Sequence, residues 1–208
     1  MDNGFPIHAK IEILEAEDSP LGISRSMGRA MIGIAEALDR LKPDILLLLG
    51  DRYEILASAQ AALIARIPIA HLHGGELTEG AVDDSIRHAI TKLANIHFVS
   101  AEPYRHRVIQ LGEQPEYVFT VGATSLDHLQ HLKLLEREEL EKSLDFSLGK
   151  CCFLTTYHSA TLSNQSPDEG AKEWLQALDY FPEAQIIMTY PGADTQWGVI
   201  VDRIEAYG

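Results

Sequence analysis

The sequence has few cysteines, few basic residues and no long hydrophobic run. The two cysteines among its 208 residues, Cys151 and Cys152, are adjacent, so they predict no disulfide framework and fit a reducing cytosol. No apolar run approaches the roughly 20 residues of a membrane span. The first ten residues, MDNGFPIHAK, do not resemble a signal peptide. We therefore expect a cytoplasmic protein that has no membrane partner.

Basic residues are outnumbered by acidic ones. Lys and Arg number 17 against 31 Asp and Glu, which gives a net charge of −14. A surface this acidic disfavours binding to nucleic acids and to anionic membranes, although a nucleotide can bind where cations gather at one site. The composition, 46% hydrophobic and 23% charged, is typical of a globular protein with a buried core.

Strand-like and helix-like segments alternate along the first 122 residues. Such alternation predicts an α/β fold in which a parallel sheet carries helices on both faces. The run at 45–49 is apolar throughout, which suits a strand that is buried on both faces. The expected strands cover residues 10–14, 45–49, 67–72, 96–100 and 117–122, and the expected helices cover residues 24–41, 54–66, 83–94 and 103–111.

A second unit follows a charged segment, residues 125–150, that has helical periodicity. Strands are expected at 151–157 and 184–190. Between them, Ser166 is a typical N-cap and Pro167 a typical first helical residue, so a helix begins there. The second unit therefore resembles the beginning of another α/β layer.

Polar side chains gather where the predicted strands end. In an open parallel sheet, ligands bind beyond the carboxyl ends of the strands, so these residues are candidates for a site. Each of them alone is equally well explained as a turn or capping residue, but the set together favours a site. The set comprises Asp51, Arg52 and Glu54 after the first buried strand, His71, His73 and Glu76 at the next, and His158 and Asp194 in the second unit.

The predicted helix at 83–94 carries two charge pairs at helical spacing. Asp83 and Arg87 are four residues apart, as are Asp84 and His88, so each pair can meet on the helix surface. Exposed ion pairs are common and weak, and on spacing alone they explain this pattern without a site.

A metal centre is one alternative for the histidines. On a strand, His71 and His73 would face the same side and could chelate a metal together with Glu76 and Asp51. The sequence has neither a cysteine motif nor an HExxH motif to support this, and His-x-His also occurs without metal. A metal-dependent hydrolase that uses His71 and His73 is therefore kept as an alternative.

Three motifs occur in order, GDR at 50–52, HGGE at 73–76 and DDSIRHAITK at 83–92. Together with VGATSLDHL at 121–129 and TTYHSAT at 155–161, they resemble the hydrolysing UDP-N-acetylglucosamine 2-epimerases of sialic-acid biosynthesis. The resemblance implies a GT-B-like fold of two Rossmann-like domains. On it we expect an N-terminal domain at 1–130 that lacks its first strand and loop, and a connector with the start of the second domain at 131–208.

The resemblance also implies an activity. UDP is eliminated from UDP-N-acetylglucosamine, or from a related UDP- or GDP-linked 2-acetamido sugar, and water adds to the resulting glycal to give free N-acetylmannosamine. Neither a nicotinamide cofactor nor a metal is implied, and the expected partners are the UDP-sugar substrate and further copies of the chain in a homo-oligomer. A non-hydrolysing 2-epimerase and a non-catalytic nucleotide-binding fragment are the alternatives.

The resemblance and the strand-end pattern together nominate the site residues. Several relatives have Glu where this chain has His73, so either His73 or Glu76 must take over that role as the base. Family members are nearly twice this length, and we expect the chain alone to bind UDP-sugar weakly and to turn it over slowly or not at all. The expected catalytic residues are Asp51, His73, Glu76, Asp83 and His158, and the expected substrate-binding residues are Arg52, Glu54, Arg87, His88 and Asp194.

Overall fold

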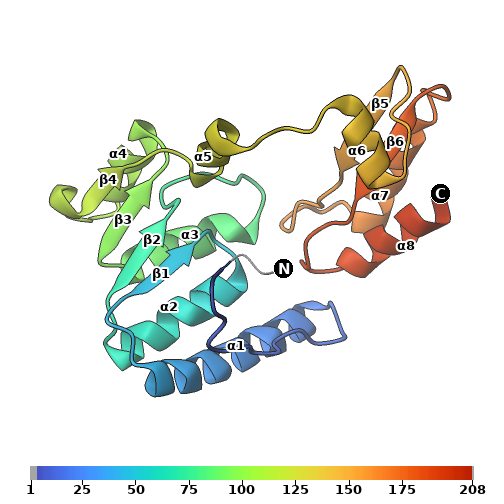
Figure 1. The fold of residues 1–208 in the computed structure, drawn as a ribbon. Coiled ribbons are helices and arrows are strands. Elements are labelled where there is room, and N and C mark those ends of the chain that lie inside the picture. The colour runs from blue at the N-terminus through green and yellow to red at the C-terminus, as the bar shows by residue number, and fades with distance from the viewer. Residues whose placement is uncertain (1–3, 208) are drawn as a thin grey trace. The chain divides into compact units, whose positions relative to one another are not determined.

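The structure is a computed structural model that describes residues 4–207, apart from the side chains of His128, Gln130 and His131. The chain divides into two compact units, Met1–Leu126 and Asp127–Gly208 (Figure 1). Each unit has its own parallel sheet, and each is described by itself. No helix among the described residues is both long and apolar enough to span a bilayer.

The first unit is built on a four-stranded parallel sheet in the order β1-β2-β3-β4. Helices alternate with these strands, which confirms the predicted α/β class. The elements are α1 (Pro20–Leu41), β1 (Leu46–Leu49), α2 (Tyr53–Ala65), β2 (Ile69–Leu72), α3 (Val82–Leu93), β3 (Ile96–Val99), α4 (Glu102–Gln110), a 3₁₀ turn η1 (Pro115–Tyr117) and β4 (Val118–Thr120).

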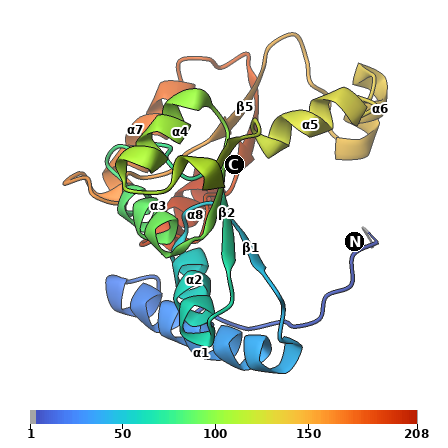
Figure 2. The same ribbon diagram turned by 90° about the vertical axis from the view of Figure 1, so that its left-hand side faces the viewer.

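The helices that follow the strands cover only one face of this sheet. The strands are ordered as in the sequence, so right-handed crossovers place α2, α3 and α4 on the same side. Helix α2 packs on β1 and β2, α3 on β2, and α4 on β3 and β4. Helix α1 forms an outer layer against α2 (Figures 1 and 2). The prediction of helices on both faces is therefore wrong for the described residues of this unit.

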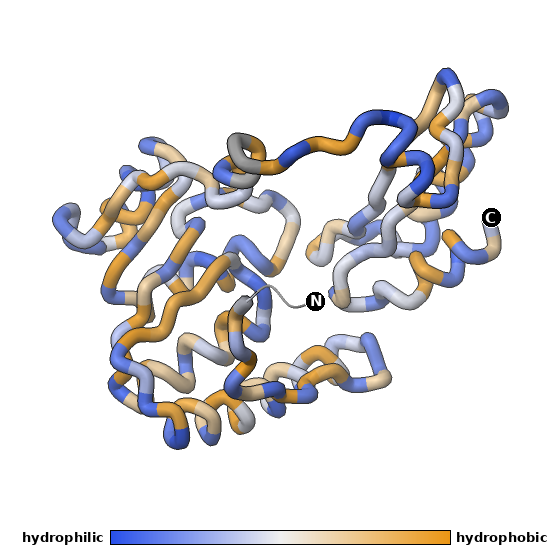
Figure 3. Tube along the Cα trace, in the orientation of Figure 1, coloured by the Kyte–Doolittle hydropathy of each residue, from blue (hydrophilic) through white to orange (hydrophobic). Residues whose placement is uncertain are grey.

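Strand β1 shows the consequence most clearly. It consists of four leucines and is hydrophobic along its whole length (Figure 3). Leu48 points to the helix-covered face and is 5% exposed, whereas Leu47 and Leu49 are 63% and 55% exposed on the other face. The prediction that this strand is buried on both faces is wrong, because no helix among the described residues of this unit lies over its second face.

The segment at 10–14, predicted as a strand, does not join the sheet. It runs along α1 instead. The backbone N–H of Glu15 donates to Ser26 Oγ at 3.0 Å, and a Cβ added at Gly33 would come within 2.5 Å of the Ile11 side chain. The polar and apolar contacts of this segment are therefore made to a helix, and its alternating pattern fits a helix surface as well as a sheet.

The second unit is organised around two parallel strands, β5 (Cys152–Thr156) and β6 (Gln185–Thr189). Helix α7 (Pro167–Leu178) begins where predicted, with Ser166 Oγ accepting from the backbone N–H of Glu169 at 3.2 Å. The remaining helices are α5 (Thr124–His131), which spans the boundary between the units, α6 (Arg137–Leu144) and α8 (Trp197–Tyr207). Helix α8, which packs on α7, was not predicted.

Candidate active site at the carboxyl edge of the first sheet

The turns after β1 and β2 are bonded to the neighbouring strand. Gly50 N–H donates to the Leu72 carbonyl at 3.3 Å, and His73 N–H donates to the Phe98 carbonyl at 2.9 Å. The parallel register thus brings the polar residues that follow the first three strands to one edge of the sheet. This edge is where the sequence predicted a site.

Asp51 forms an ion pair with Arg87 at this edge. The Arg87 guanidinium lies in α3 with its side chain only 5% exposed, and its Nη2 donates both to Asp51 Oδ2 and to Thr78 Oγ1, the latter at 2.8 Å. Burial lowers the pKa of Arg87 from its ordinary value. The interpretation of this helix as one that carries only exposed ion pairs is therefore wrong for Arg87. Its positive charge lies directly against the Asp51 carboxylate.

Asp84 extends the same network. Its Oδ1 accepts from the backbone N–H of Thr78 at 3.0 Å and lies 3.7 Å from Arg87 Nη1. Its Oδ2 lies 3.7 Å from His88 Nε2, as the four-residue spacing predicted. Asp83 precedes it in the first turn of α3, where the helix dipole favours an acidic side chain. The loop before α3 and the helix itself are thereby held together around Arg87.

Glu76 and His73 form a second pair. His73 Nδ1 and Glu76 Oε1 are 2.9 Å apart, and because a carboxylate oxygen only accepts, the ring nitrogen is the donor. The same Oε1 accepts from Ser100 Oγ at 2.5 Å. On the other side of the ring, His73 Nε2 lies 3.3 Å from Thr124 Oγ1. The side chains of His73 and Glu76 are 20% and 28% exposed, so both can meet a ligand.

The two histidines considered as a chelating pair do not share a strand face. β2 ends at Leu72, and His73 adopts the left-handed conformation with φ of 64°, so the alternation that would align it with His71 is broken. His71 is fully buried and donates from Nε2 to the Gly50 carbonyl at 2.9 Å. Within the described part of the chain, no group of three or more His, Cys, Asp or Glu residues is arranged to hold a metal.

His71 is uncharged at neutral pH. Burial lowers its pKa from 6.5 to about 4. The hydrogen bond to the Gly50 carbonyl raises the pKa, whereas the charges of His97 and His73 lower it further. Because its Nε2–H is bonded to the carbonyl just before Asp51, His71 ties the end of β1 to β2. Its role in this structure is to support the turn that carries Asp51.

Arg52 and Glu54 bind each other beside this edge. Arg52 Nε donates to Glu54 Oε1 at 2.8 Å, and the Arg52 guanidinium lies 5.6 Å from the centre of the Tyr53 ring. The side chains of Arg52 and Glu54 are 34% and 28% exposed. The opening of α2 therefore presents a cation that remains partly accessible.

His158 and Asp194 belong to the second unit. His158 lies two residues beyond β5, and Asp194 lies in the turn after β6, where its backbone N–H donates to the Gly192 carbonyl at 2.9 Å. Both lie past the carboxyl ends of their strands, as predicted. That they join the residues of the first unit in one site remains a prediction.

Three hydroxyl residues of this edge were missed by the sequence analysis, namely Thr78, Ser100 and Thr124. Ser100 directly follows β3, so the rule that selected Asp51 and His73 would have selected it as well. Thr78 and Thr124 lie in loops or at a helix start, and only their contacts to Arg87 and His73 identify them.

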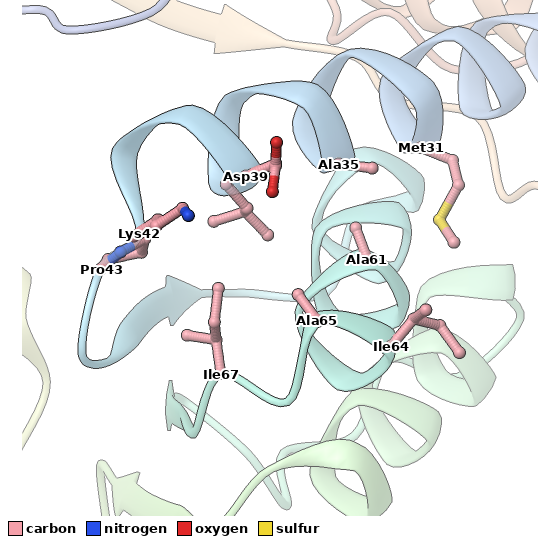
Figure 4. A pocket seen from close by; sticks show the side chains of 10 residues that line it. Met31, Ala35, Asp39, Lys42, Pro43, Ala61, Ile64, Ala65 and Ile67 are labelled. Carbon is pink, nitrogen blue, oxygen red and sulfur yellow. The ribbon is translucent and has the colours of Figure 1, made fainter.

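A cavity of about 440 Å³ lies at the opposite end of the sheet, between α1 and α2 (Figure 4). Lys42 and Pro43 precede β1 and Ile67 precedes β2, so the cavity is at the amino ends of the strands. Its lining is mostly aliphatic, with Asp39 and Lys42 as the charged members. It offers none of the acid–base pairs found at the carboxyl edge.

The sequence profile of a family described as UDP-N-acetylglucosamine 2-epimerase matches residues 1–208. The chain belongs to this family. The edge that holds Asp51, His73 and Glu76 therefore lies in an epimerase scaffold, as the resemblance of the GDR, HGGE and DDSIRHAITK motifs predicted.

Curated members of the family are similar over nearly the whole chain. A GDP/UDP-N,N'-diacetylbacillosamine 2-epimerase (hydrolyzing) from Campylobacter jejuni is 40% identical over 204 residues, which are 98% of this chain and 53% of the relative. A UDP-N,N'-diacetylbacillosamine 2-epimerase (hydrolyzing) from Legionella pneumophila is 36% identical, over 95% of this chain and 51% of the relative. Polysialic acid biosynthesis protein P7 from Escherichia coli is 35% identical, over 99% of this chain and 52% of the relative. The chain thus spans about half the length of the curated relatives it matches.

Solved epimerase structures share the fold of this family member. The UDP-GlcNAc 2-epimerase of Methanocaldococcus jannaschii, in complex with UDP-GlcNAc and UDP, matches with a TM-score of 0.71 and 22% identity over 88% of this chain and 50% of that one. The Neisseria meningitidis UDP-GlcNAc 2-epimerase bound to UDP-GlcNAc matches with a TM-score of 0.68 and 18% identity over 89% of this chain and 53% of that one. These matches confirm the predicted GT-B-like α/β fold class.

Proposed function

We propose that this protein is a hydrolysing 2-epimerase that acts on a nucleoside-diphosphate-linked 2-acetamido sugar. The observation that carries the proposal is the pair of anchored acid–base groups at neighbouring strand ends. Asp51 is bonded to the buried Arg87, and Glu76 is bonded to His73. Two titratable groups in different electrostatic surroundings are what an elimination and a later protonation require.

The His73–Glu76 pair is proposed as the base. The C2 proton of the sugar is weakly acidic, and a neutral imidazole whose other nitrogen is bonded to a carboxylate can accept it, as in other histidine–carboxylate pairs. Asp83, in the first turn of α3, is proposed as the acid that protonates C2 from the opposite side. Asp51, whose carboxylate is paired with Arg87, is proposed to stabilise the positive charge that develops at C1.

The proposed reaction proceeds in two steps. In the first step, the base takes the C2 proton, the C2–H electrons form the C1–C2 double bond, and the C1–O bond breaks with its electron pair going to the nucleoside diphosphate. In the second step, water adds to C1 as a hydroxyl group and gives its other proton to the solvent, while Asp83 protonates C2 on the other face. Overall, the nucleotide sugar and one water molecule give the free 2-epimer and the nucleoside diphosphate.

The substrate is proposed from the names of the relatives. Two of them act on N,N'-diacetylbacillosamine linked to UDP, or to GDP or UDP. UDP-N-acetylglucosamine, which gives free N-acetylmannosamine, is the other member of the same chemical class, and it is bound in two of the similar structures. The shared 2-acetamido group and the diphosphate are the features that the proposed site must recognise.

The nucleotide is proposed to be held by cations and by the second unit. Arg52 is partly exposed at the start of α2, and His88 lies on α3 beside Asp84. His158 and Asp194, past the ends of β5 and β6, are proposed to reach the nucleotide or its phosphates. On this proposal, residues 1–130 form the domain that carries the chemistry, and residues 131–208 contribute to nucleotide binding. A cytoplasmic location also remains a prediction. Both cysteines are free thiols, which is compatible with a reducing compartment.

The test is a proton NMR time course in D₂O with chain and nucleotide sugar at equal concentrations, so that slow turnover is still detected. UDP-N-acetylglucosamine and UDP-N,N'-diacetylbacillosamine are tried separately. The expected result is free 2-epimer that carries deuterium at C2, together with UDP. Asp51→Asn keeps the size of the side chain and is expected to slow the reaction about a hundredfold or more.

The possible outcomes separate the alternatives. A 2-epimer that is still linked to UDP would assign the non-hydrolysing reaction instead. Loss of activity on EDTA treatment would favour the metal-dependent hydrolase. If neither sugar gains deuterium at C2 and neither shifts the resonances of Asp51, His73 and Glu76, the proposed function is wrong for this chain.

A further inference from the structure

Ser100 is the hydroxyl residue that contacts the proposed base. It directly follows β3, and its Oγ–H donates to Glu76 Oε1 at 2.5 Å. The acceptor is a carboxylate, so the direction of this bond is unambiguous. The same oxygen receives the second bond of the pair, from His73 Nδ1 at 2.9 Å. Ser100 therefore holds the atom on which the orientation of the histidine depends.

The direction of the bonds determines where the imidazole carries its proton. With Nδ1–H donating to Glu76, the Nε2 of a neutral ring has a lone pair. Thr124 Oγ1 lies 3.3 Å from Nε2, where its O–H can donate to that lone pair. The chain of donors therefore has a serine hydroxyl at one end and a threonine hydroxyl at the other. The nitrogen that can accept a proton is the one facing Thr124.

The backbone of this turn is held in place independently of these side chains. His73 N–H donates to the Phe98 carbonyl at 2.9 Å, and the Arg107 guanidinium donates to the Gly75 carbonyl. Gly75 has φ of 79°, and a Cβ there would lie 2.5 Å from the Tyr104 carbonyl oxygen. Since the backbone cannot move freely, loss of Ser100 Oγ would change the side-chain orientations more than the turn itself.

The surrounding charged groups do not take over the function of Ser100. From β2, His71 is buried, neutral at pH 7 and bonded to Gly50. From α4, the guanidinium of Arg107 is bonded to a backbone carbonyl. Around the His73–Glu76 pair, within the part of the chain that the structure describes, the Ser100 hydroxyl is the group that anchors the Glu76 carboxylate.

We propose that Ser100 is a positioning residue that fixes the proton arrangement of the His73–Glu76 pair, with the proton on Nδ1 and the lone pair on Nε2. Without the Ser100 hydroxyl, the Glu76 carboxylate can turn towards water and His73 loses the acceptor of its Nδ1–H. The lone pair is then no longer held at Nε2. Its catalytic consequence rests on the proposed function, because only there is Nε2 the atom that accepts the C2 proton.

The first experiment does not depend on turnover. In chain labelled with ¹⁵N-histidine, above about pH 8 where histidine is neutral, the nitrogen shifts of His73 report which tautomer is present. We expect the Nδ1–H form in the unmodified chain. Ser100→Ala is expected to lower the ratio of the Nδ1–H form to the Nε2–H form about tenfold, the effect of one charge-assisted hydrogen bond. Ser100→Thr should restore the ratio.

Two further variants guard against a general structural effect. Ser24→Ala removes a hydroxyl that donates to the Pro20 carbonyl at 2.7 Å on α1, and it should leave the His73 tautomer unchanged. Ser100→Cys keeps a side chain of similar size but has only a weak donor, so it should lower the tautomer ratio as Ser100→Ala does. It serves as the test if Ser100→Ala folds poorly. Where turnover is measured, Ser100→Ala should lower kcat about tenfold and leave KM within about twofold.

Each outcome bears on one of the two proposals. A tautomer change without turnover in any variant supports the role of Ser100 and counts against the proposed function. Turnover by the unmodified chain with a His73 tautomer that is the same in Ser100→Ala and Ser24→Ala overturns the role of Ser100 and leaves the function standing. An Nε2–H tautomer in the unmodified chain also overturns it.

Discussion

The two faces of the first sheet differ sharply although both are apolar. On the covered face, Leu48 and Val118 are 5% and 2% exposed, and His71 and His97 lie fully buried between them in the same row of the register. On the other face, Leu47 and Leu49 of β1 and Phe119 of β4 are about half exposed or more. Burial in this sheet therefore follows the path of the chain and not the hydrophobicity of the residue.

The first way to test this comparison is to truncate one leucine on each face. Leu48→Ala is expected to lower the free energy of unfolding by about 3 kcal/mol, because it leaves a cavity under the helices. Leu47→Ala is expected to cost less than about 1 kcal/mol, since that side chain already meets water. Urea unfolding followed by circular dichroism measures both. Equal costs for the two variants would show that the faces are equally buried in solution.

The second test uses the buried histidines of the covered face. Burial lowers the pKa of His71 from 6.5 to about 4, so between these values the unfolded chain binds more protons than the folded one. The free energy of unfolding therefore has its full value above pH 6.5 and decreases as the pH is lowered, by about 2 kcal/mol at pH 5. The pKa of His97 is lowered by burial as well, which adds to the loss.

Urea unfolding at pH 5 and pH 7 measures this loss. His71→Gln should remove much of the difference between the two pH values, whereas His106→Gln, at an exposed position on α4, should keep it. If His71→Gln retains the full pH dependence of the unmodified chain, then His71 is not the source of the acid sensitivity.

The third test concerns the aromatic contact on the uncovered face. The rings of Phe98 and Phe119 are stacked with centroids 5.8 Å apart. Phe119→Leu is expected to cost about 1 kcal/mol, because the ring contact is lost while little burial is at stake. Phe119→Tyr keeps the ring and should cost less. Thermal unfolding compares them, and identical midpoints would mean that the stacking contributes nothing measurable.

The smallest effect is expected from a charge on the uncovered face. Leu47→Lys should change the free energy of unfolding by less than about 0.5 kcal/mol, since the long side chain can keep its ammonium group in water. Chemical unfolding together with sedimentation checks this. A cost of about 2 kcal/mol or more, with a change in sedimentation, would show that another surface covers this face in solution.

Much of the candidate site followed from the sequence. Parallel strands end at a common edge, so the sequence alone groups Asp51, His73 and Glu76. Their partners could not be predicted in the same way. Helical spacing paired Arg87 with Asp83 and did not reveal its bond to Asp51, 36 residues away. Such a contact depends on how a helix packs against a strand, which periodicity does not encode.

The sequence by itself determined the alternation of strands and helices, the parallel sheet and the family of the chain, because these follow from local periodicity and from ordered motifs. Only the tertiary structure decided which leucines of β1 are buried, since strand order and crossover direction set which face the helices cover. It also decided that His71 and His73 are not a chelating pair, because the strand ends at Leu72 and the backbone at His73 turns to a positive φ.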